Sequence, residues 1–258
     1  VTMKKELGRS RLLWGIAIVP AMVGSSAMAA LLWDNGPLVI HPGGGFGGAD
    51  ASRLMNTTFG ENILGYGYQL SAGNAVADDF TILDAAGWHI ESITFFGYQT
   101  GGPENGDVRI QADILDAFPV DLPAGTYTGG PGVFSGIYRD SETSAGDNAR
   151  AIQAITVDVN ADFAAGVHWL SWQADGNPAF SGPWAPPVSY IDAINGPNPL
   201  GEAPNGHQYT AAGGWNPLED SGSLSPDELP FIINGRVLPG PGSIGLLLVV
   251  AGLRRSRR

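Results

Sequence analysis

Apolar and polar residues alternate in several short segments of this chain. The range 108–116 carries an apolar residue at almost every second position, and the range 155–160 repeats this pattern. Because successive side chains of a strand point to opposite faces, a period of two predicts half-buried strands of an antiparallel sheet. Less regular strands are predicted over 76–82, 88–98, 133–138, 166–173 and 231–236. In the range 88–98, the adjacent Phe95 and Phe96 predict a bulge or burial on both faces.

Glycine and proline separate these segments. The chain has 38 glycines and 19 prolines, spread between the apolar stretches. Such spacing favours an all-β sandwich or barrel and suits helices badly. The ranges 43–48, 178–187 and 195–222 lack a strand pattern, and only 50–58 offers a weak helical turn. With no internal repeat and no convincing linker, we expect one antiparallel, all-β domain over residues 30–238.

The N-terminal residues predict export. Four basic residues precede an apolar stretch over 12–23, and small residues follow it as far as Ala29. This order is typical of a secretory signal peptide over residues 1–29, cleaved after Ala29. An N-terminal membrane anchor is the alternative interpretation, but the apolar stretch has the length of a signal peptide.

The C-terminal residues 239–258 have the features of a sorting signal. Pro239, Gly240 and Pro241 precede an apolar run over 244–253, which four arginines follow: Arg254, Arg255, Arg257 and Arg258. The run is shorter than the roughly 20 apolar residues of a membrane helix, and the arginines favour a cytoplasmic end. The pattern resembles the bacterial PEP-CTERM sorting tail, with Pro-Gly-Pro in the place of Pro-Glu-Pro. The resemblance implies transient membrane insertion of the tail and processing by an exosortase-like enzyme.

The charge of the body differs from that of the whole chain. The chain has 13 basic and 25 acidic residues, but eight of the basic ones and one acidic residue lie in the two end segments. The body therefore carries five arginines, no lysine and 24 carboxylates, a net charge of −19. This charge excludes nucleic acid as a partner, because phosphate binding relies on Lys and Arg. It suits either solubility in a salty medium or divalent-cation binding by carboxylates, with calcium as the cation.

Asp78 and Asp79 are the first candidate ligands of calcium. They are adjacent in a predicted strand, so one of the two carboxylates is expected to face inward. A buried carboxylate needs a metal ion or hydrogen-bond partners. Calcium ligation at a sandwich edge is one interpretation. A strand end with both groups solvated or capping a turn is the other, and the rarity of buried aspartates favours it.

Asp175 and Asn177 are the second pair of candidate ligands. They follow the predicted strand 166–173 and share the Asp-x-Asn spacing of calcium loops, without the later Glu of an EF-hand. Asp-Gly is also a common turn dipeptide, so a simple turn is the favoured alternative.

No catalytic signature is found. The chain has no cysteine, and its four histidines occur singly, without metal-ligand spacing. No serine lies in a Gly-x-Ser-x-Gly elbow, and the glycine-rich range 43–48 lacks the lysine and the helix of a phosphate-binding loop. We therefore expect no enzymatic activity, and a secreted hydrolase is the third hypothesis.

Two tryptophans are candidate carbohydrate ligands. Trp184 lies in a proline-bounded loop and Trp215 in a glycine-rich loop, where flat indole faces suit sugar rings. A carbohydrate-binding module, with or without calcium, would present both on one groove. The favoured alternative is that they pin loops to a core filled by Trp88, Trp169 and Trp172.

Several segments of the body resemble exported β-sandwich proteins that have PEP-CTERM-like tails. The segments that carry the resemblance are 33–37, 76–80, 87–100, 169–176 and 181–187. It implies a jelly-roll-like sandwich of envelope-associated or secreted character and no known reaction. The leading hypothesis is therefore an exported protein of the cell envelope or extracellular matrix, with a structural or adhesive role. An extracellular carbohydrate-binding module is the alternative.

Overall fold

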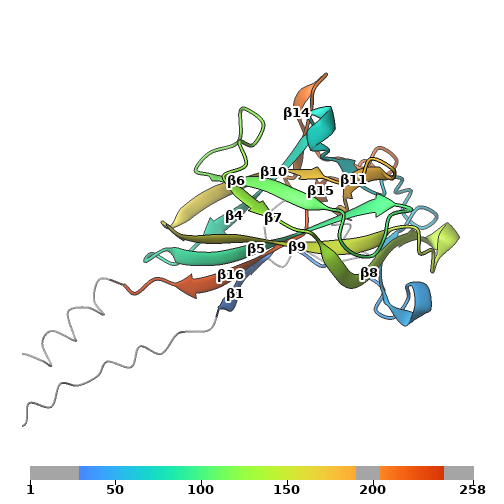
Figure 1. Ribbon diagram of the computed structural model, residues 1–258, viewed down its shortest axis with the longest axis horizontal. Coiled ribbons are helices and arrows are strands. Elements are labelled where there is room, and N and C mark those ends of the chain that lie inside the picture. Colours follow the sequence, from blue (N-terminus) through green and yellow to red (C-terminus); the bar gives the residue numbers. More distant parts are fainter. Residues whose placement is uncertain (1–28, 190–203, 241–258) are drawn as a thin grey trace, which may run out of the picture.

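The computed structural model describes residues 29–189 and 204–240, and within them the chain is built almost entirely of β-strands (Figure 1). The strands are β1 (Ala30–Asp34), β2 (Asp50–Leu54), β3 (Tyr66–Gly67), β4 (Ala75–Ile82), β5 (Trp88–Thr100), β6 (Arg109–Leu115), β7 (Tyr127–Gly129), β8 (Val133–Ser141), β9 (Ala151–Phe163), β10 (Gly166–Asp175), β11 (Ser181–Ala185), β12 (Val188–Ser189), β13 (His207–Thr210), β14 (Gly214–Pro217), β15 (Asp227–Glu228) and β16 (Phe231–Val237). Three short 3-10 turns, η1 (Phe46–Gly48), η2 (Leu70–Ala72) and η3 (Glu142–Ser144), accompany them. The predicted all-β fold is confirmed.

Most of the described strands belong to one large curled sheet. Its main path runs β1-β16-β5-β9-β7-β6-β10-β4-β13-β14, and β12 pairs with β15 in a separate two-stranded sheet. Every strand pair is antiparallel except β2 with β8. The longest strands, β5 and β9, have 13 residues each and pair with each other within this path. The antiparallel arrangement is therefore confirmed, whereas the sandwich architecture and the jelly-roll topology stay predictions.

The strands with clear alternation were predicted well. The range 108–116 becomes β6, and 155–160 lies within β9. In β5, Phe95 is fully buried in the main core and Phe96 packs against a smaller cluster, so burial on both faces is confirmed. The register of β5 against β9 shifts between Ile90 and Ser92.

The weak helical turn predicted over 50–58 is confined to its end, where residues 56–59 form a turn and the Phe59 amide donates to the Met55 carbonyl oxygen at 2.9 Å. Residues 50–54 form β2, which pairs in parallel with β8, and Arg53 is held there by two hydrogen bonds to Asp140. Two ranges without a strand pattern also contain strands, β11 and the β13–β14 hairpin. In each case pairing with a distant segment overrides a weak local preference.

Aromatic side chains fill the core between the curled faces. Phe80 packs against Trp33, Trp88 and Phe231, and Phe95 lies 4.9 Å from Trp172 between ring centroids. Trp88 and Trp172 are buried, as the sequence predicted. Trp169 is not in this core: it alternates with the buried Leu170 and therefore faces the outside of the sheet.

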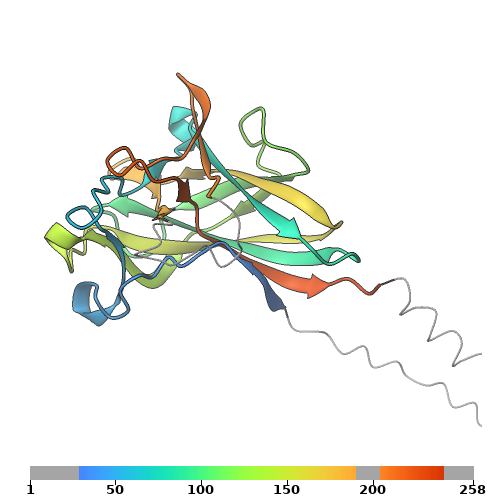
Figure 2. The same ribbon diagram turned by 180° about the vertical axis from the view of Figure 1, so that it is seen from behind.

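The two ends of the body leave the sheet at the same edge. β1 pairs with β16, and Ala30 lies opposite Gly235. Figures 1 and 2 show β1 and β16 side by side at one end of the molecule. Val237 of β16 pairs in turn with Trp88, the first residue of β5. The described residues contain no helix with the length and apolar character needed to cross a membrane.

Candidate functional site

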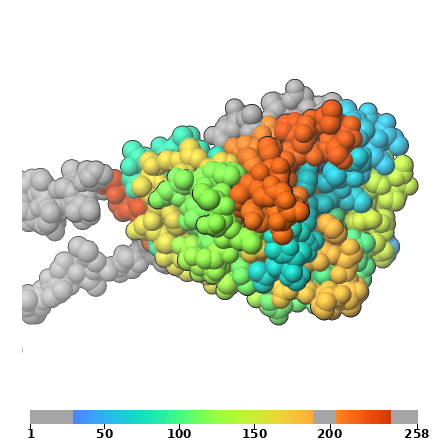
Figure 3. All heavy atoms as spheres, turned by 90° about the horizontal axis from the view of Figure 1, so that it is seen from above, coloured from blue at the N-terminus to red at the C-terminus, as the bar shows by residue number. Residues whose placement is uncertain are grey.

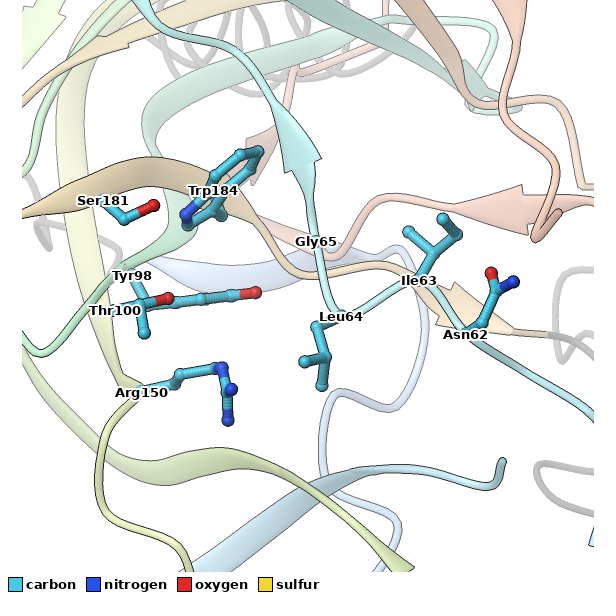
Figure 4. Close-up of a pocket in the computed structure, with 9 residues that line it drawn as sticks. All are labelled: Asn62, Ile63, Leu64, Gly65, Tyr98, Thr100, Arg150, Ser181 and Trp184. Carbon is cyan, nitrogen blue, oxygen red and sulfur yellow. The ribbon is translucent and has the colours of Figure 1, made fainter. Parts of the chain in front are cut away.

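A cavity of about 290 Å³ lies at the far end of β5, beside β11 (Figure 4). Four separate segments of the chain contribute to its walls: the loop before β3, the end of β5, the residue just before β9, and β11. The lining residues are Asn62, Ile63, Leu64, Gly65, Tyr98, Thr100, Arg150, Ser181 and Trp184. Folding thus places Trp184, a predicted carbohydrate ligand, in a concave site.

Strand pairing sets the position of Trp184. In β11 it lies opposite Gly67 of β3 on one side and opposite Tyr98 of β5 on the other. The register of β11 against β5 shifts between Ser181 and Trp184. Trp184 is half-buried and packs against the smaller apolar cluster that contains Tyr98. The indole is therefore held by the sheet while part of it stays accessible.

A glycine lets the opposite wall approach. A Cβ on Gly65 would lie 2.6 Å from the Tyr98 hydroxyl oxygen and 2.9 Å from Trp184 Cβ. Any larger residue would therefore push this wall away from β11. Below the wall, the buried Arg139 donates hydrogen bonds to the carbonyl oxygens of Leu64 (2.9 Å) and Ile63 (3.1 Å), which fixes the segment in place.

The Tyr98 hydroxyl supplies a neutral polar group. Tyr98 is only 2% exposed, and burial raises the pKa of its hydroxyl to about 12, although the nearby charges of Arg139 and Arg150 lower it. The hydroxyl makes no hydrogen bond to any described residue and points into the space between Trp184 and Arg150 (Figure 4). It is therefore protonated at neutral pH and available to a ligand.

Arg150 supplies the positive charge. Its Nη1 donates to Asp147 Oδ2 at 2.9 Å, and its side chain is 19% exposed. Within the described part of the chain, its other guanidinium nitrogens make no hydrogen bond. Figure 4 shows the guanidinium group on the same side of the cavity as Tyr98, facing Leu64. One edge of the guanidinium group is therefore left for a ligand.

These groups suit binding better than catalysis. Pockets for small molecules combine an apolar lining with a few placed polar groups. Here an indole and two aliphatic side chains surround hydroxyls and a guanidinium group. Among the described residues, the lining includes no carboxylate and no imidazole, which are the usual general acids and bases.

The predicted calcium ligands Asp78 and Asp79 point to opposite faces of β4. Asp78 is completely buried, whereas Asp79 is half-buried and receives a hydrogen bond of 3.1 Å from Asn205. Asp78 Oδ1 accepts from the Asp79 amide and Oδ2 from the Leu229 amide, both at 2.8 Å. The prediction that one carboxylate faces inward is therefore confirmed, and its oxygens are used by hydrogen bonds. The favoured alternative, a strand end with both groups solvated, is wrong because both residues lie inside β4 and Asp78 is buried.

Glu228 is the partner of Asp78 that the sequence did not reveal. The two side chains are hydrogen-bonded, and Glu228 Oε1 also accepts from the Asn205 amide at 2.8 Å. Burial and the Glu228 charge raise the pKa of Asp78 well above its usual value, and burial raises the pKa of Glu228. The pair is therefore expected to share a proton. Among the described residues, no group of three or more Asp, Glu, His or Cys is arranged to hold a metal ion.

Asp175 and Asn177 form a turn. Asp175 Oδ1 accepts from the Gly176 amide at 2.9 Å, and Asn177 Oδ1 accepts from the Ala179 amide at 3.0 Å. Asp78 pairs with Leu170, so Asp175 lies five residues further along β10, about 16 Å away. The structure therefore does not bring the two pairs of candidate calcium ligands together.

Trp215 belongs to a different surface. It lies on the β13–β14 hairpin, with its ring centroid 5.5 Å from that of Tyr209 and 5.7 Å from that of Phe118. Phe118 also contacts Trp169 and His207 edge to face. Figure 3 shows the β6–β7 loop, in green, against this hairpin, in orange. Trp215 thus pins a hairpin and a loop to each other, and it does not line the Trp184 cavity.

The predicted sorting residues lie mostly beyond the described part of the chain. Pro239 is exposed just after β16. Pro241, Arg254, Arg255, Arg257 and Arg258 lie outside the described residues, as does nearly all of the predicted signal peptide.

Comparison of the chain with protein-family models, curated proteins and solved structures finds no match. The geometry of the cavity is therefore the basis for the functional proposal.

Proposed function

We propose that this chain is an exported, non-enzymatic adhesive protein whose body binds a saccharide in the Trp184 cavity. One observation carries the proposal: a half-buried indole, a hydroxyl without a hydrogen-bond partner among the described residues and a guanidinium group converge on one space. Aromatic side chains present an apolar face that suits the C–H face of a sugar ring, and the polar groups suit its hydroxyls. The volume of about 290 Å³ suits a small unit such as one sugar ring of a longer chain.

The position of the cavity supports an adhesive role. β11 pairs with the Thr100 end of β5, whereas β16 pairs with its Trp88 end. Along a strand of this length the two ends lie about 40 Å apart. If the tail following β16 is the sorting segment that the sequence predicts, the cavity faces away from the point of attachment.

Calcium has no part in this proposal. Asp78, Asp79, Asp175 and Asn177 all lie outside the lining of the cavity. Trp215 is also excluded, because its ring is used within a separate aromatic cluster.

Retention of the purified protein on immobilised plant and marine polysaccharides tests the proposal. We expect retention on at least one polysaccharide, lost in Trp184→Ala and kept in Trp215→Ala. Circular dichroism establishes that both variants fold. Absence of retention on the whole panel, or equal loss in the two folded variants, would overturn the proposal.

A further inference from the structure

We propose that the saccharide bound in the Trp184 cavity is an acidic one, and that Arg150 binds its carboxylate. This inference rests on the proposed function and adds the chemical class of the ligand. Two observations support it: the lining is rich in hydrogen-bond donors, and the Arg150 guanidinium group is only partly paired within the protein.

The side chains of the cavity are rich in hydrogen-bond donors. Its ionisable and hydroxyl groups are Arg150, Tyr98, Thr100 and Ser181, and the Asn62 amide lies at its rim. A guanidinium group only donates, and a hydroxyl can donate or accept. Because the described lining residues carry a positive charge and no carboxylate, this set favours a ligand that offers acceptor oxygens and negative charge.

Arg150 is less fully paired than Arg53 and Arg139. Arg109 and Arg236 also use one guanidinium nitrogen each, but they lie exposed and outside the described lining of the cavity. Arg53 binds both oxygens of Asp140, with Nε and Nη2 at 2.8 and 2.7 Å. Arg139 is buried and bonded through three of its nitrogens to protein oxygens. Arg150 uses one nitrogen, for Asp147, and keeps a free edge beside the Tyr98 hydroxyl.

The free edge has the geometry for a carboxylate. Arginine presents its donors in a planar fork that matches a carboxylate, which a lysine ammonium does not. The bond to Asp147, three residues earlier, orients the fork while Asp147 itself stays out of the lining. A uronic acid stacked on Trp184 would place its carboxylate within the region that Arg150 and Tyr98 face (Figure 4).

The positive charge of Arg150 lies in a body whose net charge is strongly negative. The described domain carries far more carboxylates than arginines, so its overall field repels an anionic chain. Selectivity for an acidic sugar can therefore come only from a local contact, and Arg150 is the only cation among the described residues that line this cavity. The test therefore needs a control variant that loses the same charge outside the cavity.

The test compares oligogalacturonate with its carboxyl-reduced, neutral counterpart by isothermal titration at constant salt. We expect the unmodified protein to bind the acidic form at least about tenfold more tightly, as one charge-assisted hydrogen bond implies. Arg150→Gln should abolish this preference, and Arg150→Lys should restore only part of it. Arg109→Gln removes the same charge from an exposed arginine outside the cavity and should keep the preference.

The outcomes separate the two proposals. Equal affinity for the two forms, or a preference that survives Arg150→Gln, overturns the acidic-ligand inference while Trp184-dependent binding still supports the proposed function. Equal loss of preference in Arg109→Gln attributes it to net charge and also overturns the inference. No Trp184-dependent binding of any saccharide overturns both.

Discussion

Trp184 of β11 lies opposite Tyr98 of β5, and the space between their side chains and Arg150 is the cavity proposed to bind a saccharide. The pairing brings together residues that are 86 positions apart in the chain. β11 pairs with β5 near Thr100, at the end that contributes to the cavity. The last residue of β16 pairs with Trp88, at the opposite end of β5. One strand therefore links the predicted attachment point to the predicted binding site.

Gly65 sets the width of the cavity, so Gly65→Ala should weaken saccharide binding. The new Cβ would lie 2.6 Å from the Tyr98 hydroxyl oxygen and 2.9 Å from Trp184 Cβ, which forces the wall to shift. Overpacking of this kind typically costs about 1–3 kcal/mol of stability. Chemical denaturation and ligand titration measure both effects. Gly240→Ala, with open space around its Cβ, is the control, and equal behaviour of the two variants would contradict the account.

Arg139 fixes the Ile63–Leu64 segment of the cavity wall through hydrogen bonds to its carbonyl oxygens. Arg139→Met should therefore lower the free energy of unfolding by at least about 2 kcal/mol. The substitution leaves the carbonyl oxygens of Ile63 and Leu64 without their buried donor. Arg236→Met removes an exposed pair with Glu91 and should cost less than about 1 kcal/mol. Urea denaturation of both variants checks the difference. A similar small effect of both substitutions would show that Arg139 does not fix the wall.

The Asp78–Glu228 pair should make the protein less stable at alkaline pH. Because the pKa of Asp78 is raised in the folded state, the native protein keeps a proton that the unfolded chain loses. The resulting stabilisation is fully present below the unfolded pKa, about 4, and is lost as pH rises through the folded value.

The variant Asp78→Asn tests this assignment. It keeps an acceptor for the Leu229 amide and removes the titration, so its stability should depend less on pH between 5 and 9. Asp175→Asn makes the same change in net charge at an exposed turn and should keep the slope of the unmodified protein. Thermal melting across this range provides the comparison. An unchanged slope in Asp78→Asn would exclude the pair as its source.

Calcium and a chelator should give the same melting temperature at matched ionic strength. The oxygens of Asp78 already accept hydrogen bonds, and Asp175 lies about 16 Å further along the sheet. A ligand that binds only the folded state would raise the melting temperature. A calcium-dependent rise of several degrees would therefore restore the sequence prediction of a specific site.

The sequence revealed the strands that follow a simple period and missed those that depend on distant partners. β6 and much of β9 show their alternation directly, because one face is buried and the other is not. The β13–β14 hairpin lies in a range rich in glycine and polar residues, where packing of Tyr209, Trp215 and Phe118 stabilises it. Such contacts join separate segments and leave no local pattern.

The candidate site was only partly predictable for the same reason. Trp184 was identified because an indole in a proline-rich segment is conspicuous. Nothing local distinguishes Tyr98 or Arg150 from other members of their strands and loops, and sheet pairing alone brings them to the cavity. Glu228 was likewise one acid among many until β15 placed it against Asp78.

A crystal structure of the protein with a retained acidic oligosaccharide tests the central claim most directly. The account predicts one sugar ring against the indole of Trp184, with its carboxylate at hydrogen-bond distance from the free edge of Arg150. A sugar bound at the Trp215 cluster or elsewhere, with the Trp184 cavity holding only water, would contradict it.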